Sequence, residues 1–234
     1  MTKTFRNGEY KTKGEYHREI NKNWKYYPVY LAKMQFIEKY ITKITKNADI
    51  LDIGSGEGVL VEKIRELGYN IIGVDLNYAS KYVIKGNMTK LPFKDEIFKD
   101  ILCLDVLEHL NFDEQKEALS EIKRALKKNG VLILSIPNLA HFASRISFLF
   151  TGKLIRTSEI ERHKGDRPIG EYLAMLNKLN FKIVERKGIF PTFPLSSLLT
   201  YLFPSRVLFL HKILNMFFSY PNLCFLNIII CKKR

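Results

Sequence analysis

Cysteine is scarce in this chain of 234 residues, which holds only Cys103, Cys224 and Cys231. The number is odd and no two of them have CxxC spacing, which argues against a disulfide framework and against a cysteine-based zinc site. All three lie in apolar runs, so we expect them to be buried thiols in strands.

Long apolar runs are also missing. No window offers about 18 uninterrupted apolar residues, so we expect no helix that spans a membrane. The first thirteen residues are polar and basic, which predicts no signal peptide and a cytoplasmic protein. Apolar residues still make up 46% of the chain, enough for the core of one α/β domain with additions.

Acidic residues are absent from the stretch 187–234, which holds six Lys or Arg. Residues 1–46 hold eleven Lys or Arg against four Glu, so the ends carry +6 and +7 and the middle carries 14 − 7 − 6 = +1. Basic ends suggest an anionic membrane surface, a nucleic acid or an acidic substrate as partner, or a Lys-rich composition that only aids solubility. Nucleic acid ranks lowest because no recognition module is readable.

Apolar strands and amphipathic helices alternate along the middle of the chain, which is typical of a parallel sheet covered on both faces. The ends add a helix after Pro28, helices near 140–150 and 169–179, and one or two short helices within 194–220. We therefore expect an N-terminal basic helical cap (1–46), a main domain (47–190), and an apolar basic helical insertion with the last strand (191–234). The expected strands are 49–54, 70–75, 82–86, 98–105, 131–137, 181–190 and 223–234, and the helices between them are 58–68 and 112–130.

A glycine turn stands at the first strand-to-helix junction, in Asp52-Ile53-Gly54-Ser55-Gly56-Glu57-Gly58. Glycine lets the backbone turn sharply and approach a ligand closely, and the helix that follows presents free N–H groups. Asp75 ends the second strand nineteen residues after Gly56. There its carboxylate can accept hydrogen bonds from two ribose hydroxyls, each worth roughly 1.5–3 kcal/mol.

A dinucleotide is the competing ligand for such a turn. Its fingerprint, GxGxxG/A, requires a small residue where this chain has Val59. The bulkier side chain disfavours an NAD-dependent or nucleotide-sugar enzyme but leaves it as an alternative.

Four ordered segments of the chain are ILDIGSGEG, IIGVDLN, GNMTKLPFKDEIFKDILCLDVLEHL and LKKNGVLILSIPN. They resemble the corresponding segments of class I S-adenosylmethionine-dependent methyltransferases, and among these the ubiquinone-biosynthesis O-methyltransferases. The resemblance covers about residues 47–138. It implies a Rossmann-like, doubly wound, mostly parallel seven-stranded sheet with an antiparallel last strand, S-adenosyl-L-methionine as cofactor, and methyl transfer to O or N of a small-molecule or lipid-like acceptor. A non-catalytic partner protein that binds the cofactor is the alternative.

The same resemblance implies the cofactor contacts. The turn holds the methionine part, Asp75 the ribose, and the next segment the adenine. Asn87 stands where an aspartate usually bonds the adenine amino group, and its amide carbonyl can make the same bond without charge. The implied residues are Asp52, Gly54 and Gly56 with Ser55 and Gly58 alongside, Asp75, Leu76 against adenine, Asn87, Met88 through its N–H, and Leu104 and Asp105 beside the methionine amino group.

Catalytic candidates stand directly after the fourth strand. In a helical turn Asp105, Glu108 and His109 would face one way, and His141 could approach the same rim. The resemblance admits three roles: His109, with Glu108, as a catalytic base; Asp105, Glu108 and His109 as weak candidates for a divalent metal; or a loop that closes on the cofactor. A base is needed only if the acceptor must lose a proton.

Two further segments are ambiguous. We expect the loop with Arg162 and His163 to be solvated, with substrate contact as the alternative. Before the first helix, an aromatic segment either forms a lid over the cofactor, as in relatives, or packs in the core; it comprises His17, Trp24, Tyr26 and Tyr27.

The stretch 189–220 holds more apolar surface than one helix can bury against a sheet edge. It could complete the core over the substrate mouth, form a homodimer, or lie on an anionic membrane as a basic amphipathic element.

Overall fold

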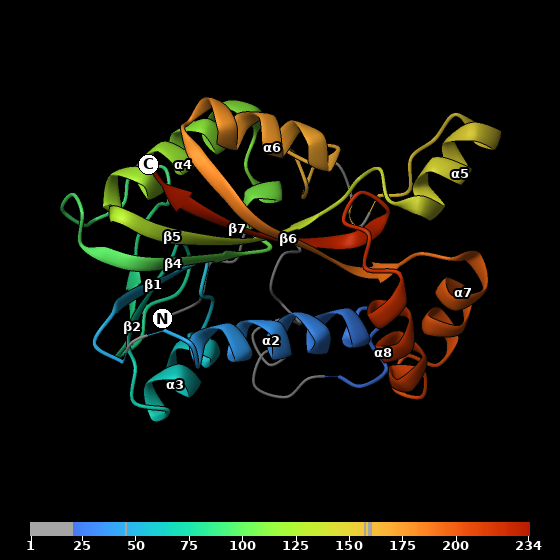
Figure 1. The fold of residues 1–234 in the computed structure, drawn as a ribbon, viewed down its shortest axis with the longest axis horizontal. Helices are drawn as coiled ribbons and strands as arrows, with labels where there is room; N and C mark the ends of the chain where they lie inside the picture. The colour runs from blue at the N-terminus through green and yellow to red at the C-terminus, as the bar shows by residue number, and fades with distance from the viewer. Residues whose placement is uncertain (1–20, 45, 157, 159–160) are drawn as a thin grey trace.

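The computed structural model describes residues 21–44, 46–156, 158 and 161–234. Its centre is a seven-stranded sheet in the order β3-β2-β1-β4-β5-β7-β6. Strand β7 pairs antiparallel with both neighbours and the remaining pairs are parallel, which confirms the predicted sheet (Figure 1). The strands are β1 (Asp49–Ile53), β2 (Asn70–Asp75), β3 (Val83–Lys85), β4 (Phe98–Leu104), β5 (Leu126–Pro137), β6 (Phe181–Pro191) and β7 (Cys224–Lys233).

Helices cover both faces of the sheet. Helices α2 (Tyr27–Ile41) and α3 (Val59–Glu66) lie on one face, and α4 (Phe112–Ala125) and α6 (Ile169–Lys178) on the other (Figure 1). Two apolar clusters, one under each pair of helices, form the core. All three cysteines are buried free thiols, as expected.

Helix α2 follows its sequence pattern closely. Pro28 stands in its first turn, where a missing N–H costs nothing. Its buried side chains recur every four residues, at Val29, Lys33, Ile37 and Ile41. That stripe packs on the sheet and carries one charged residue, Lys33, into the interior.

The predicted C-terminal end of the helix after the fourth strand, near residue 130, is wrong. Helix α4 begins with a capping box between Asn111 and Glu114 but ends at Ala125, not near residue 130. Leu126 is extended and fully buried, and it already pairs with Phe98 as the start of β5. Burial of that leucine in the sheet outweighs the helix propensity of the lysines after it.

Three short helices gather at one end of the molecule, away from α3 (Figure 1). They are α5 (Phe142–Thr151), α7 (Pro194–Leu202) and α8 (Leu208–Phe217), so the stretch 194–220 forms two helices. We call residues 142–156 and 194–220 the apolar lobe. Within the described residues, none of the helices has the length and hydropathy needed to cross a bilayer.

Candidate functional site

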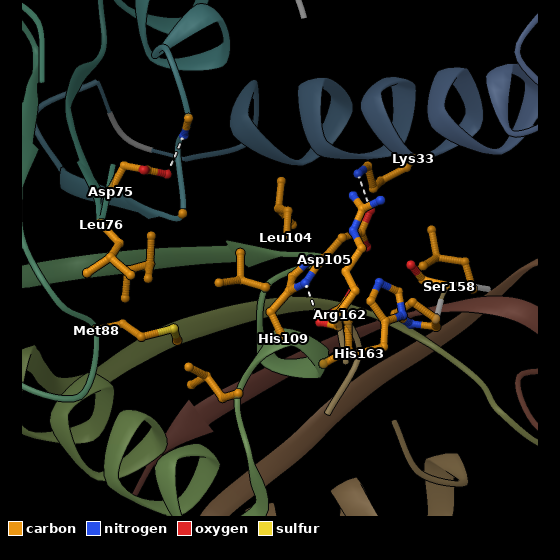
Figure 2. A pocket seen from close by; sticks show the side chains of 18 of the residues that line it. Lys33, Asp75, Leu76, Met88, Leu104, Asp105, His109, Ser158, Arg162 and His163 are labelled. Carbon is orange, nitrogen blue, oxygen red and sulfur yellow. Dashed lines mark hydrogen bonds and ion pairs between the residues drawn. The ribbon is translucent and has the colours of Figure 1, made fainter. Parts of the chain in front are cut away.

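A cavity of about 350 Å³ opens at the carboxyl ends of β1, β2 and β4. This is the edge of a doubly wound sheet at which ligands bind, and the volume is in the range of small-molecule sites. Figure 2 shows Asp75, Leu76 and Met88 on one side of it and Lys33, Asp105, His109, Arg162 and His163 on the other. The cavity therefore has two ends of different chemistry.

The glycine turn after β1 forms the floor of the first end. Gly54 and Gly56 have φ of 71° and 55°, in the left-handed region that disfavours side chains. A methyl group on Gly54 would stand 2.3 Å from Val106, whereas one on Gly56 would meet nothing within 4 Å. Gly56 thus leaves open the space that a ligand would fill.

The Asp75 carboxylate is held rigidly at the end of β2. One oxygen accepts a hydrogen bond of 2.9 Å from the Gly56 N–H, and the other accepts bonds from Asn77 and Tyr78 at 2.8 and 3.2 Å. The carboxylate is buried and lines the cavity. The oxygen bonded to Gly56 keeps a second lone pair, so the group is held in place to accept a further hydrogen bond from a ligand hydroxyl.

Apolar side chains follow Asp75 along this wall. Leu76 and Met88 line the cavity together with Asn87. The Asn87 side-chain oxygen accepts a hydrogen bond of 3.0 Å from the Thr89 N–H, which is a turn contact. A second lone pair of that oxygen still permits a bond to a ligand amino group.

Three of the implied cofactor residues support the site without lining it. Asp52 is buried inside β1, where burial first and the nearby Asp75 second raise its pKa to about 7, against the effect of Lys33. The Ser55 side chain packs against Gly73, and Gly58 caps the start of α3. The implied residues that do line the cavity are Gly54, Gly56, Asp75, Leu76, Asn87, Met88, Leu104 and Asp105.

Lys33 is a site residue that the sequence analysis missed. Its ammonium group lies 2.5 Å from the Asp105 carboxylate, which also accepts a short hydrogen bond from the Ser135 hydroxyl. Burial would raise the pKa of Asp105, but Lys33, Ser135 and His109 outweigh it and lower the pKa. The pair therefore carries both charges beside the cavity.

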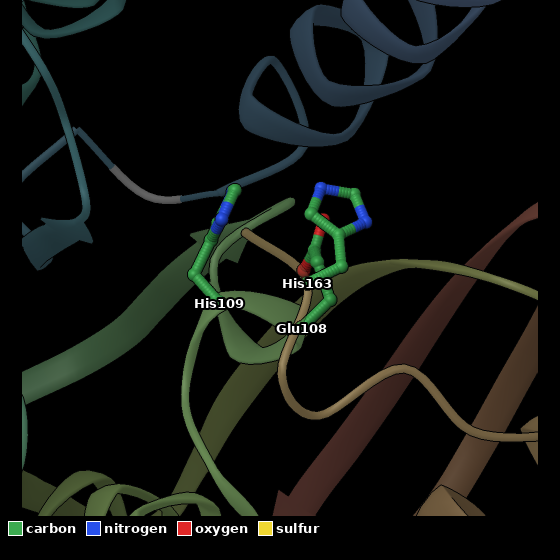
Figure 3. A group of neighbouring side chains, drawn as sticks. All are labelled: Glu108, His109 and His163. Atoms are coloured by element: carbon green, nitrogen blue, oxygen red, sulfur yellow. The ribbon is translucent and has the colours of Figure 1, made fainter. Parts of the chain in front are cut away.

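Glu108, His109 and His163 gather at the second end (Figure 3). Glu108 and His109 lie in a short 3₁₀ turn (Leu107–His109), and the ligand atoms of the three side chains all lie within 4.8 Å of one another. The His109 and His163 rings meet edge to face at 4.8 Å. Glu108 is buried with one carboxyl oxygen unbonded, and burial first and Asp105 second raise its pKa well above the usual range.

The structure corrects several expectations at this end. Asp105 turns toward Lys33, so the cluster that could hold a metal contains His163 in its place. The loop with Arg162 and His163 is not simply solvated, because both residues line the cavity and His163 is buried. His141 does not reach the rim; it is buried as the N-cap of α5.

Aromatic residues close the cavity near α2. Trp24 and Tyr26 line it, and the Tyr26 ring stacks on Phe225 of β7 at 5.2 Å. This placement agrees with the lid alternative for these two residues. His17 lies outside the described residues.

Fold and cavity together define a Rossmann-like domain with a glycine turn, a fixed carboxylate at the end of β2 and a cavity that extends from it; this class of domain binds nucleoside-containing cofactors. Comparison with known proteins narrows this class. Residues 51–134 match the family described as a methyltransferase domain. A solved structure of an S-adenosylmethionine-dependent methyltransferase from Archaeoglobus fulgidus superposes with a TM-score of 0.59 at 22% identity, over 87% of this chain and 93% of that one.

Two curated relatives match part of the chain. An uncharacterised protein of Methanocaldococcus jannaschii is 35% identical over 94 residues, 38% of this chain and 40% of that protein. A ubiquinone biosynthesis O-methyltransferase of Pelagibacter ubique is 32% identical over 109 residues, 41% of this chain and 45% of that enzyme. The match thus spans less than half the length of either relative. These comparisons support a class I S-adenosylmethionine-dependent methyltransferase domain in residues 51–134.

Proposed function

We propose that this chain transfers a methyl group from S-adenosylmethionine to an O or N nucleophile of a small-molecule or lipid-like acceptor. The observation that carries the proposal is the continuity of the cavity from Asp75 to the His109–His163 pair. One end offers contacts for a nucleoside and the other offers groups that can take a proton. The O-methyltransferase named among the relatives supports oxygen as the acceptor atom.

The residues at the first end fit the cofactor. The open space at Gly56 and the fixed Asp75 carboxylate suit the ribose, and Leu76 and Met88 offer apolar contact to adenine. Lys33 and Asp105 present one charge each, which matches the carboxylate and amino groups of the methionine part. S-adenosylmethionine supplies a methyl group on a sulfonium, which is a strong leaving group.

His109 is the proposed proton acceptor. Its Nδ1 lies 3.1 Å from the Arg162 carbonyl oxygen, which can only accept, so Nδ1 donates its hydrogen there and Nε2 is the nitrogen proposed to take the proton of the methyl acceptor. The charged Asp105 stabilises the imidazolium that results. Glu108 lies beside this ring, and burial first and the nearby Asp105 second raise the pKa of its carboxyl group, which favours the protonated form.

The same cluster supports a second role, divalent metal binding. One carboxylate and two imidazoles match the donors of a catalytic zinc site, where a cation would polarise an acceptor hydroxyl. Calorimetric titration with Zn²⁺ separates the two roles. Binding that Glu108→Gln and His163→Ala each abolish would favour the metal role, and absence of binding would leave His109 as the base.

The experiment for the proposed function is transfer of labelled methyl from S-adenosylmethionine into fractionated cell extract. We expect a labelled product with the wild type, and loss of at least 100-fold with His109→Ala at unchanged cofactor affinity. Asp113→Ala, on the exposed surface of α4, is the control. Cofactor binding without labelling of any fraction would instead favour the non-catalytic partner protein.

A further inference from the structure

The helices of the apolar lobe bury polar side chains and expose apolar ones. A helix on a water-soluble protein buries its apolar face and exposes its polar face. Helix α7 buries Ser196 and Thr200, while Leu195 and Leu198 on its outer side are 69% and 55% exposed. Its amphipathic pattern therefore matches an apolar environment outside the protein.

The other two helices of the apolar lobe repeat this inversion. Helix α5 buries Ser144 and exposes Leu149 and Phe150 at 77% and 80%, and α8 buries His211 and exposes Phe209 at 74%. Fourteen of the nineteen large apolar side chains that are exposed among the described residues lie in this lobe. Such a concentration marks an interaction surface.

The charge of this surface indicates which kind of partner it binds. The apolar lobe contains five Lys or Arg and neither Asp nor Glu. Lys212 shares the exposed side of α8 with Phe209 and Met216, and Arg206 stands over the Phe203 ring. A two-fold dimer would set this cationic face against its own copy, which repels. An anionic lipid surface complements both the charge and the exposed apolar rings.

We propose that the apolar lobe docks on an anionic lipid membrane, with α5, α7 and α8 lying in the interface and their basic residues at the headgroups. Helices of nine or ten residues with one apolar side suit this position.

The apolar lobe is also continuous with the lining of the cavity. Phe225, which lines the cavity, contacts the Phe190 ring at 6.2 Å, and Phe190 stacks on His211 of α8 at 4.5 Å. A docked lobe would therefore bring the cavity close to lipid-embedded acceptors. This last step rests on the proposed function, whereas docking itself does not.

Co-sedimentation of the full chain with vesicles tests the docking without any activity assay. We expect binding to vesicles of phosphatidylcholine with about 30% phosphatidylglycerol, a fraction that gives the anionic surface potential that attracts basic segments. Binding should be weaker at high salt. Lys153→Glu with Lys212→Glu should lower binding at least 25-fold, at about fivefold or more for each basic residue removed. Leu149→Ser with Phe209→Ser should lower it at least tenfold.

Matched controls lie at the other end of the molecule. Lys94→Glu and Leu67→Ser change an exposed lysine and a half-exposed leucine outside the apolar lobe and should bind like the wild type. A thermal melt of each variant shows that it folds. No sedimentation at low salt, or equal binding to pure phosphatidylcholine, would overturn the proposal. The proposal would also be overturned if the wild type does not bind vesicles but forms a dimer in solution, and if Leu149→Ser with Phe209→Ser dissociates that dimer.

Discussion

Lys33 on α2 places its ammonium nitrogen 2.5 Å from a carboxylate oxygen of Asp105, at the end of β4. The two residues are 72 positions apart in the chain. The pair ties the helix over the cavity to the strand beneath it. It also sets the charge beside the space where the methionine part of the cofactor is proposed to lie.

Removing Lys33 should therefore weaken both the fold and cofactor binding. In Lys33→Met, Asp105 loses its cation, and we expect a loss of about 1–2 kcal/mol in unfolding free energy. This is less than a fully buried pair would lose, because the Asp105 side chain is 34% exposed. Calorimetry should show at least tenfold weaker S-adenosylmethionine binding. Lys39→Met, on the exposed side of α2, is the control; an equal effect of both variants would contradict the assignment.

Gly56 and Gly152 form a matched pair for testing the glycine turn. Both have left-handed φ, 55° and 66°, and an added methyl group would meet no atom within 4 Å at either position. Alanine should cost each roughly 1–2 kcal/mol of stability through backbone strain. Only Gly56→Ala should impair cofactor binding, because only Gly56 lines the cavity. Thermal melts and calorimetry on both variants check this, and intact binding by Gly56→Ala would refute the role of the turn.

Two buried histidines should make stability depend on pH. Burial lowers the pKa of His141 and of His211 to about 4 each. The His141 Nδ1 accepts from the Ser144 N–H as a helix cap, so protonation would break that bond. In the unfolded chain both histidines bind protons below about pH 6.5, whereas in the folded chain they do so only near pH 4. The free energy of unfolding is therefore highest above about pH 6.5 and falls as the pH is lowered toward 4. Between pH 7 and 5 we expect a loss of about 2 kcal/mol for each histidine.

Urea denaturation at the two pH values measures this dependence. His141→Asn preserves a capping side chain without a titrating group, so it should lose about 2 kcal/mol less than the wild type on acidification. The same loss in both proteins would show that His141 is not responsible.

Sequence alone predicted the parts of the site that depend on local geometry. Gly54, Gly56 and Asp75 belong to short strand-to-loop segments whose backbone form the residue types dictate. Lys33 also had a signal, as the one charged member of an apolar stripe at four-residue spacing. Its partner could not be predicted, because the contact depends on how α2 lies over the sheet.

His163 shows the limit most clearly. The loop that carries it is polar, and solvation was the natural expectation. The tertiary fold instead buries the ring against His109. Likewise, the sequence shows that the stretch before the last strand is apolar. Which side chains it buries depends on the tertiary fold, and the folded helices bury serine and threonine and expose leucine.

Calorimetric titration of the wild type and of Asp75→Ala, with S-adenosylhomocysteine and with NAD, tests whether the cavity binds S-adenosylmethionine-type ligands through Asp75. We expect micromolar or tighter binding of S-adenosylhomocysteine by the wild type, no binding of NAD, and a loss of at least 30-fold in Asp75→Ala, roughly 2 kcal/mol for the lost charge-assisted bonds. Binding of NAD alone, or unchanged affinity in Asp75→Ala, would contradict it.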